Sequence, residues 1–561
     1  MGPDGVIPYG HSGDFGVIGG RPVEETQVLI AGGGPVGLAL AVELGTRGVD
    51  CLLVEPRSRT RLVPRAKLTN VRTMEHLRRW GIADELRRAT PLPAAYSTDI
   101  AFVTRVIGGR EITRFPNVFN TAPIRDERFA EPAQQVPQYV LEPILRRRAQ
   151  STGHVRFCAP GVKVLGVHAR EDGAEVAVGD GTGSRISVRA SFVAGCDGGA
   201  SLVRSELGIA MEGRRGIARN FSVVFRSGEL GRRMSFAPAL HFWTVNERTP
   251  AFMGPLDRHG LWWLQATRLD PAVDLSSLDP EAVVEGAVGA RLSDIEIVGT
   301  DPWEVHELTA QRLRHGCVFL AGDAAHVHSP MGAHGMNQGI GDAADLGWKL
   351  AAVLGGWGGA GLLESYQAER GPFHLRAIAE ASRNNSTLPN ELLRAGLEDE
   401  GPGAERSRAE LAAEIQRQKG REFNSLGLVL GHCYEGSPVI VPDGTVAPPE
   451  EISTFTPRAR PGMRFPHRWL ADGSSLFDHL GPAFTLLRVG EAQIEPLVRS
   501  AQRCGVPLRV ITVDQPQVAA AYLGRMALVR PDQVLAWHND HAPDDPDDIF
   551  HTITGIPGIG V

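Results

Sequence analysis

The chain has 561 residues and a net charge of −7 at pH 7, and 42% of its residues are hydrophobic. This length exceeds what one hydrophobic core supports, so we expect several domains. The acidic balance leaves no positive surplus for a nucleic-acid partner, and no apolar run approaches the roughly 18 residues that cross a membrane. The start of the chain lacks the basic and apolar parts of a signal peptide, and the six cysteines show no metal or disulfide spacing. We therefore expect a cytoplasmic protein with reduced thiols.

The first strong signal is a short apolar strand at residues 28–31 that runs directly into a glycine pattern. Pro35 lies in the first turn of the helix that we expect next, and the pattern itself is GxGxxG, formed by Gly32, Gly34 and Gly37. In dinucleotide-binding folds such glycines allow a tight turn, a close approach to the pyrophosphate and close packing of helix on sheet. A second apolar strand at residues 51–54 ends in Glu55, whose carboxylate can accept hydrogen bonds from a ribose. The stretch predicts a site for a dinucleotide cofactor.

Two later turns are candidates to hold polar groups of the same ligand. An expected strand at residues 191–195 leads into an Asp-Gly turn at Asp197, and a second one at residues 318–321 ends in Gly322 and Asp323. The alternative is an ordinary turn with a helix cap. Three arginines near the ribose acid are candidates to reach the cofactor and can equally be solvated surface residues: Arg57, Arg65 and Arg72.

Between these turns the sequence predicts four strands that are unusually aromatic, at residues 220–226, 240–245, 251–253 and 261–269. Alternation along a strand places His241 and Trp243 on one face. The aromatic side chains form either a hydrophobic sheet core or a flat wall for an aromatic ligand. The candidates for such a wall are Phe225, Trp243 and Trp262.

The last part of the chain predicts a separate unit without redox chemistry. Residues 401–464 read as a polar helical segment followed by a Pro-rich linker, and residues 465–561 follow the strand and helix order of a thioredoxin-type fold. Cys504 is its one cysteine, which excludes dithiol chemistry. We also predict no metal site, because no acid or thiol stands at a matching spacing from the three neighbouring histidines, His326, His328 and His334.

Together these motifs resemble the single-component FAD-dependent aromatic hydroxylases, the flavoprotein monooxygenases of the p-hydroxybenzoate hydroxylase type, over about residues 25–400. Phenol, biphenylol and polyketide hydroxylases look closest, because they share the segment at 64–75 and a redox-inactive thioredoxin-like tail. The resemblance implies that the glycine loop and Glu55 bind adenosine and pyrophosphate, that Asp197 touches FAD and that Asp323 holds the ribityl chain. It also implies a proline that lines the substrate side of the flavin and further FAD contacts, at Pro330, Gln138, Gly335, Met336 and Asn337.

The fold implied by this resemblance combines α/β and α+β parts. A Rossmann-like FAD-binding domain is interleaved with a substrate domain built on a mixed β-sheet, and a thioredoxin-like domain follows. We expect a loose arm at residues 1–25, the FAD-binding domain at 26–105, 138–215 and 310–400, and the substrate domain at 106–137 and 216–309.

The implied activity is the hydroxylation of a phenolic or aromatic polyketide-type substrate by NAD(P)H and O2, through a C4a-hydroperoxyflavin, as in antibiotic biosynthesis. NADPH or NADH is expected to bind transiently, because the chain has no second GxGxxG unit. The resemblance also leads us to expect a homodimer. Baeyer–Villiger insertion or epoxidation by the same cofactor stays open, and so does a catalytically inactive FAD-binding module.

Lys67 is the one departure from the family pattern that bears on catalysis. Several relatives carry a histidine directly after Pro-Arg-Ala, where it can deprotonate the substrate, whereas this chain has Lys67 there and only three other lysines. A desolvated lysine could act as the base, or stay charged and stabilise a phenolate. It could instead reach solvent or pair with an FAD phosphate. His241 and His334 are the next candidates for the base.

Overall fold

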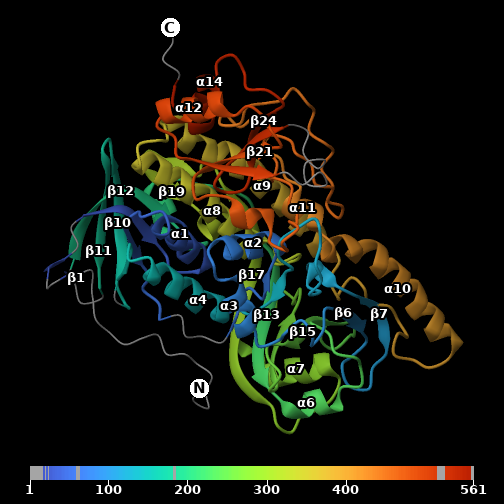
Figure 1. Ribbon diagram of the computed structural model, residues 1–561. Coiled ribbons are helices and arrows are strands. Elements are labelled where there is room, and N and C mark those ends of the chain that lie inside the picture. The colour runs from blue at the N-terminus through green and yellow to red at the C-terminus, as the bar shows by residue number, and fades with distance from the viewer. Residues whose placement is uncertain are drawn as a thin grey trace.

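The computed structural model describes residues 25–58, 63–158, 160–180, 185–513 and 525–557, together with the backbone of β1 (Val17–Ile18) and β2 (Arg21–Pro22). The expected arm at residues 1–25 lies, apart from these two strands and Glu25, outside the described residues. Figure 1 shows the first sheet and its helices on one side of the molecule, the second sheet below them, and the C-terminal domain above. Among the described helices, none is long and apolar enough to cross a membrane.

The first sheet carries the glycine loop at the end of its central strand. Its order is β10-β11-β12-β3-β4-β9, and β19 pairs with β12 and with β18. The strands from β12 through β9 and β19 run parallel. Their apolar runs are buried on both faces, as parallel strands require. The members are β3 (Glu25–Ala31), β4 (Cys51–Val54), β9 (Val155–Phe157), β10 (Lys163–Arg170), β11 (Gly173–Gly179), β12 (Arg185–Gly195), β18 (Arg314–His315) and β19 (Val318–Leu320).

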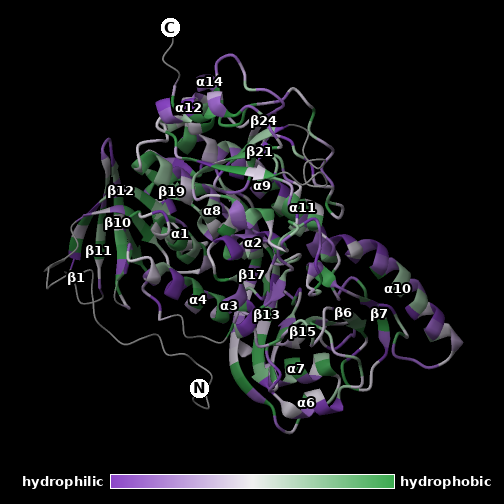
Figure 2. Ribbon diagram, viewed as in Figure 1, coloured by the Kyte–Doolittle hydropathy of each residue, from purple (hydrophilic) through white to green (hydrophobic). Residues whose placement is uncertain are grey.

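Helices cover this sheet, and two of them begin at its carboxyl edge. The core combines strand residues with α1 (Pro35–Gly45), α4 (Gln138–Ser151) and α8 (Gly335–Leu354). Figure 2 shows hydrophobic (green) stretches in α1 and α8, whereas α4 also carries hydrophilic (purple) stretches. The remaining helices of the FAD-binding region are α2 (Val71–Arg79), α3 (Ala83–Ala89), α5 (Leu202–Glu206) and α9 (Ala360–Asn385).

The second sheet has the order β20-β17-β13-β16-β15-β14-β6-β7. The long antiparallel pair of β13 and β17 forms part of this sheet. Strand β6 also belongs to it, although residues 26–105 were expected to belong to the FAD-binding domain. The strands are β6 (Ile100–Val103), β7 (Glu111–Phe115), β13 (Met211–Arg226), β14 (His241–Thr244), β15 (Ala251–Pro255), β16 (Leu261–Ala266), β17 (Glu296–Ala310) and β20 (His326–Val327). Helices α6 (Gly228–Arg233) and α7 (Pro280–Val288) supply core residues to one face. The two-stranded pair β5 (Leu68–Thr69) and β8 (Gln134–Gln135) stands apart from both sheets.

The C-terminal domain has the thioredoxin-type order that the sequence predicted. Its sheet runs β22-β21-β23-β24, with β21 parallel to β22 and antiparallel to β23. Before it come α10 (Pro402–Phe423) and α11 (Leu426–Leu430). The domain's elements are β21 (Phe484–Val489), α12 (Glu495–Arg503), β22 (Leu508–Val513), β23 (Met526–Val529), β24 (Leu535–Asn539) and α14 (Asp547–Thr554).

A fully buried group of ion pairs joins this domain to α8 and α9. Arg530 donates to Glu369 Oε1 at 2.6 Å, to Asp345 Oδ1 at 3.0 Å and to Asp532 Oδ2 at 2.6 Å. Lys349 Nζ lies 2.8 Å from Asp345 Oδ2 and 2.7 Å from Glu369 Oε2. Removing one partner from such a group leaves an unpaired buried charge and costs about 3–5 kcal/mol. The C-terminal domain is therefore an integral part of the structure.

Candidate active site

A cavity of about 1170 Å³ lies between the carboxyl edge of the first sheet and one face of the second. Its lining includes the glycine loop and Glu55 at one end, Asp323 and the start of α8 in the middle, and Lys67 with the aromatic strands at the other end. A single small ligand typically occupies roughly 300–1,000 Å³. The cavity therefore has room for an extended cofactor together with a second molecule.

At the first end, the glycine loop presents backbone to the cavity. Gly32 has a φ of +105°, and a Cβ added to it would lie 2.3 Å from the carbonyl oxygen of Cys196. A Cβ on Gly37 would lie 1.9 Å from the carbonyl oxygen of Gly32, so no other residue fits there. Gly34 and Pro35 line the cavity at the start of α1. The positive end of the α1 dipole and its free N–H groups thus face the cavity, as phosphate binding requires.

Glu55 stands beside this helix start at the end of β4. Its Oε2 accepts a hydrogen bond from Gly33 N at 2.8 Å, and its Oε1 accepts one from Arg57 N at 2.9 Å. These bonds fix the carboxylate at the cavity wall. Arg57 and Arg65 also line the cavity, both with exposed side chains, and Arg65 Nε lies 3.7 Å from Asp301 Oδ2.

Arg72, the third candidate arginine, turns away from this cavity. It lies on α2 and bonds to Glu75, to Gln533 and to the carbonyl oxygen of Asp532. The arginine therefore contacts the C-terminal domain, and the expected contact with the cofactor is wrong for it.

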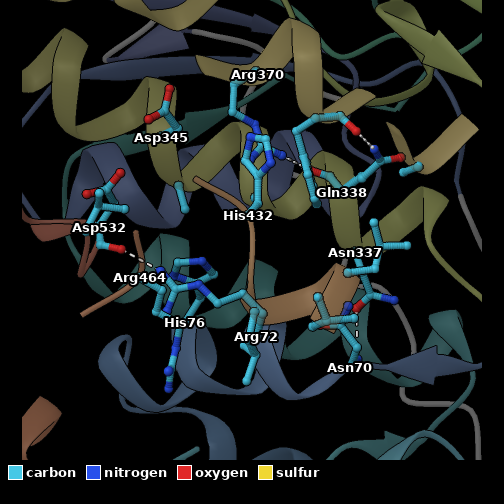
Figure 3. Close-up of a pocket in the computed structure, with 18 of the residues that line it drawn as sticks. Asn70, Arg72, His76, Asn337, Gln338, Asp345, Arg370, His432, Arg464 and Asp532 are labelled. Carbon is cyan, nitrogen blue, oxygen red and sulfur yellow. Dashed lines mark hydrogen bonds between the residues drawn. The ribbon is translucent and has the colours of Figure 1, made fainter. Parts of the chain in front are cut away.

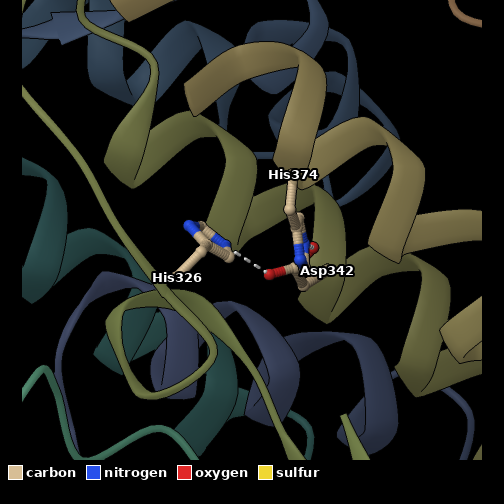
Figure 4. Close-up of side chains that lie close together, drawn as sticks. All are labelled: His326, Asp342 and His374. Atoms are coloured by element: carbon tan, nitrogen blue, oxygen red, sulfur yellow. Dashed lines mark hydrogen bonds and ion pairs between the residues drawn. The ribbon is translucent and has the colours of Figure 1, made fainter. Parts of the chain in front are cut away.

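Asp323 points from a short turn into the middle of the cavity, with its side chain exposed there. The turn is anchored from behind by Asp342 on α8. Asp342 Oδ2 accepts from Gly322 N at 3.1 Å and from His326 Nε2 at 2.9 Å, and its Oδ1 accepts from Arg370 Nε and His374 Nε2, both at 2.8 Å. Figure 4 shows the carboxylate between the two histidines.

These three residues, Asp342 with His326 and His374, stand at the spacing of a metal site. Burial opposes ionisation of Asp342, but the charges of His374 and Arg370 and the bond from His326 hold its pKa well below the usual range. Because Arg370 bonds to the same carboxylate, we interpret Asp342 and its partners as a hydrogen-bonded network that supports the Gly322 turn.

Two further predicted cofactor residues sit on the same wall. Gln138 donates through Nε2 to Glu142 Oε1 at 2.7 Å and lines the cavity. Asp197 caps the start of α5, where its Oδ2 accepts from Val203 N at 3.1 Å. Its other oxygen, Oδ1, is buried without a hydrogen-bond partner among the described residues. A buried acceptor of this kind calls for a ligand or a water.

The start of α8 faces the cavity through Gly335 and Met336. No side chain caps this helix, so its first amides are free to donate to a ligand. Asn337 does not line the cavity. Its side chain accepts from Asn70 N at 2.9 Å and donates to the carbonyl oxygens of Leu68 and Ala333 at 3.0 and 2.8 Å. Asn337 therefore fixes the helix start to β5 (Leu68–Thr69), which directly follows Lys67.

At the other end of the cavity, Lys67 is a cation without an acidic partner among the described residues. Its Nζ lies 4.1 Å from the centre of the Trp263 ring, and burial lowers the pKa of Lys67 to about 8. Next to it, His241 Nε2 lies 3.3 Å from Gln135 Nε2, and the His241 ring meets Trp263 edge-on. Burial, and then the charge of Lys67, lowers the pKa of His241 to about 3, so this histidine is neutral at physiological pH.

The aromatic wall is formed by only one of the three predicted residues. Trp243 lines the cavity, whereas Phe225 and Trp262 lie on the opposite face, in the core beneath α6 and α7. They pair with each other across β13 and β16, so both point the same way. The cavity face is completed instead by Phe252, Trp263 and Gln265. The predicted shared face of His241 and Trp243 is confirmed.

Helix α10 supplies cavity residues that sequence reasoning missed. Glu422 and Phe423 line the cavity, and Glu422 Oε2 lies 2.7 Å from Lys419 Nζ, which stands 4.6 Å from the centre of the Trp243 ring. Burial raises the pKa of Glu422, and burial lowers that of Lys419. The sequence held one indication of a functional role for this helix, because Lys419 is one of only four lysines in the chain.

Pro330 and His334 flank a turn before α8. Pro330 lines the cavity, but His334 points away from it into a smaller neighbouring pocket. Burial, with a contribution from His328, lowers the pKa of His334 to about 3. The prediction of His334 as an alternative base is wrong on this placement, because its ring is turned from the substrate end.

The residues present fit FAD. Two helix starts offer free amides to the cavity, one for a pyrophosphate and one for the ring edge, and carboxylates at Glu55 and Asp323 can accept from sugar hydroxyls. When bound, FAD supplies the redox chemistry that no side chain of the cavity offers.

Comparison with known proteins supports this assignment. A family model described as an FAD binding domain matches residues 25–381, and a second one, described as the C-terminal domain of aromatic-ring hydroxylases, matches residues 458–557. A putative polyketide hydroxylase from Streptomyces halstedii is 31% identical over 96% of this chain and 99% of its own length. Phenol 2-monooxygenase from a Pseudomonas species is 30% identical over 95% of this chain and 93% of its own.

The fold agrees with that of a solved relative over almost the whole chain. The rebeccamycin biosynthetic enzyme RebC, in a structure with reduced flavin, superposes with a TM-score of 0.87 at 35% identity, covering 96% of this chain and 100% of RebC. The order of the motifs, the cavity and these matches agree. The chain belongs to the FAD-dependent aromatic-ring hydroxylases, monooxygenases that use FAD, NAD(P)H and O2.

Proposed function

We propose that this enzyme hydroxylates a phenolic ring of a fused polycyclic substrate, which Lys67 holds as the phenolate. The observation that carries the proposal is the Lys67 ammonium, which lies on the Trp263 face beside a neutral His241 and has no acidic partner in the described part of the chain. A phenolate is the ligand that completes this arrangement, because it neutralises a desolvated cation and stacks on an aromatic wall. Deprotonation also makes the ring more electron-rich, which favours electrophilic attack on carbon.

The other end of the substrate cavity supports a large substrate with a second polar group. Glu422 and the Trp243 ring stand on the α10 side, and Phe252 and Trp263 extend the flat wall. A fused aromatic system with hydroxyl groups at both ends would use Lys67 and Glu422 together. The name of the putative polyketide hydroxylase supports this substrate class, whereas phenol 2-monooxygenase is named for a one-ring substrate.

The remaining assignments of residues to FAD follow from the same geometry. We propose that the start of α1 and Glu55 hold the pyrophosphate and adenosine, that Asp323 holds the ribityl chain, and that the amides of Gly335 and Met336 face the flavin. Asp197 Oδ1 and Gln138 complete this wall. The homodimer and the cytoplasmic location stay predictions; light scattering of the purified protein tests the first.

The test combines a substrate screen with two variants of Lys67. Phenols and polycyclic aromatics are screened for stimulation of NAD(P)H oxidation, with the product characterised by mass and by its ring system. Lys67→Met should keep FAD and flavin reduction, while hydroxylation falls and hydrogen peroxide release rises. Lys67→Arg keeps a cation that cannot act as a base, so retained coupling assigns charge stabilisation and lost coupling assigns general-base catalysis.

Three results would contradict parts of the proposal. Unchanged coupling and an unchanged pH profile in Lys67→Met remove Lys67 from the mechanism. A ring-expanded product favours Baeyer–Villiger insertion over hydroxylation. Stimulation only by one-ring phenols refutes the polycyclic substrate class.

A further inference from the structure

A second, smaller pocket lies behind the active site, between the FAD-binding region and the C-terminal domain. Its volume is about 80 Å³. A buried water needs roughly 10–15 Å³ on this scale, so the pocket holds a few waters or one small ion with water, and no nucleotide. Its lining comes from α2, α8, α9, the segment around α11 and the C-terminal domain. In the view of Figure 3, His432 lies between Arg370 on one side and Arg72, His76 and Arg464 on the other.

The buried polar atoms that lack a partner in this pocket are all nitrogens. Among the described lining residues they include Arg464 Nη1, His334 Nε2 and His432 Nε2. The Arg464 side chain is 4% exposed and is held in place, because its Nε donates to Glu75 Oε2 at 2.9 Å. Its Nη1 is thus a charged donor fixed at the pocket wall, and a buried donor without an acceptor is costly.

The carboxylates that line the pocket cannot serve as those acceptors. Asp345 is bonded to Lys349 and Arg530, and Asp532 is bonded to Arg530 through both oxygens. Burial first, and then the charges of four arginines, lower the pKa of His76 well below its usual range: Arg72, Arg79, Arg370 and Arg464. Each of these arginines is paired with a carboxylate, so it is the unpartnered nitrogens, and not a net charge, that favour an acceptor such as an anion over a cation.

We propose that this pocket binds a small monovalent anion, such as chloride, bromide or nitrate, and that the anion ties Arg464, at the start of the C-terminal domain, to the segment after α11 and to the start of α8. The Arg464 Nη1 group is its charged donor, and the rings of His432 and His334 donate to it in their Nε2–H tautomers, which for His432 leaves Nδ1, 3.5 Å from Glu450 Oε1, without the proton. The anion adds to the Arg530 ion pairs as a second link between the C-terminal domain and α8.

The experiment uses the FAD-loaded full chain. Its unfolding midpoint is followed as bromide or nitrate replaces gluconate at constant ionic strength, since gluconate is too large for the pocket. A bound anion should raise the midpoint by about 2 °C or more, and the rise should saturate. Crystals grown in bromide should show an anomalous peak beside Arg464 Nη1.

Two variants and a matched control separate the site from general salt effects. His432→Phe removes a ring donor together with the 3.5 Å contact of its Nδ1 with Glu450 Oε1, and Arg464→Lys keeps a charge for Glu75 but loses the free Nη1. Each should weaken bromide binding by about tenfold or more. Arg78→Lys is the control, because Arg78 also joins α2 to the C-terminal domain, through Asp478, but lies outside the pocket. It should leave the bromide response unchanged.

Water alone at Arg464 in the bromide crystals, or equal stabilisation by all anions in every variant, overturns the proposal. These outcomes do not depend on turnover, so they are independent of the proposed substrate.

Discussion

Replacing Lys67 by methionine should make the protein more stable while it impairs hydroxylation. Burial lowers the pKa of Lys67 from 10.5 to about 8, which corresponds to a destabilisation of about 3 kcal/mol when the lysine is charged in the folded state. The contact of Nζ with the Trp263 ring offsets about 1 kcal/mol of this cost. Lys67→Met has similar volume and no charge, so at pH 7 we expect a gain of about 2 kcal/mol in the free energy of unfolding.

The gain should disappear with rising pH. Between pH 8 and 10.5 the folded lysine has lost its proton while the unfolded one still holds it, so the unfolded chain binds more protons. The stability of the wild type relative to the variant therefore rises with pH across this window and is lowest, and constant, below pH 8.

The assay is chemical denaturation of both proteins, FAD-loaded and without substrate, at a series of pH values from 7 to about 10.5. The control is Lys163→Met, which removes an exposed lysine on β10 that also lines the cavity; at saturating FAD it should change neither the stability nor its pH dependence. If Lys67→Met is no more stable than the wild type, or if the difference does not change with pH, then Lys67 does not sit as a desolvated cation and the reasoning fails.

Three further predictions follow from the cavity and the C-terminal domain. Asp323→Ala should bind FAD about tenfold more weakly or worse, because the cofactor loses a charged acceptor worth about 1.5–3 kcal/mol; an unchanged affinity in an FAD titration would place the ribityl site elsewhere. Trp263→Leu should uncouple NAD(P)H oxidation from hydroxylation, whereas Trp262→Leu should lower stability and leave coupling intact, and equal uncoupling in both would contradict the assignment of faces. Cys504→Ser should leave turnover unchanged, since its thiol lies 4.0 Å from His551 Nε2, also contacts Ser500, and has a pKa that burial raises; lost activity in a stable variant would refute this.

The cofactor end of the cavity could be predicted because its chemistry depends on local backbone. Gly32, Gly37 and Glu55 act within one strand–turn–helix–strand unit, where a few residues decide both the fold and the contacts. The N-terminal start of α8 shows where such local reasoning fails. The glycine-rich stretch around Gly335 reads as a loop by propensity, yet packing of α8 against α1 extends the helix into it.

The residues at the substrate end of the cavity could be predicted only in part, because they depend on strand pairings that no local sequence pattern contains. Alternation placed His241 and Trp243 together, but it could not say which of Trp262 and Trp263 faces the ligand. That choice follows from the register of β15 against β16, in which Gly254 pairs with Trp263 and Phe252 with Gln265. Glu422 was missed for a related reason, because a polar helix far along the chain gives no sign of the sheet edge on which it packs.

The Arg530 group sets a rule for recombining this enzyme with its relatives. A chimera with a crossover between α9 and the C-terminal domain would bring together carboxylates from one parent and the arginine from the other. Asp345 and Glu369 would then face a residue from the other parent inside a fully buried interface, where any mismatch leaves a charge without a partner. Chimeras that are made to exchange substrate specificity should therefore take residues 345, 349, 369, 530 and 532 from a single parent. Their crossovers should lie within the second sheet instead.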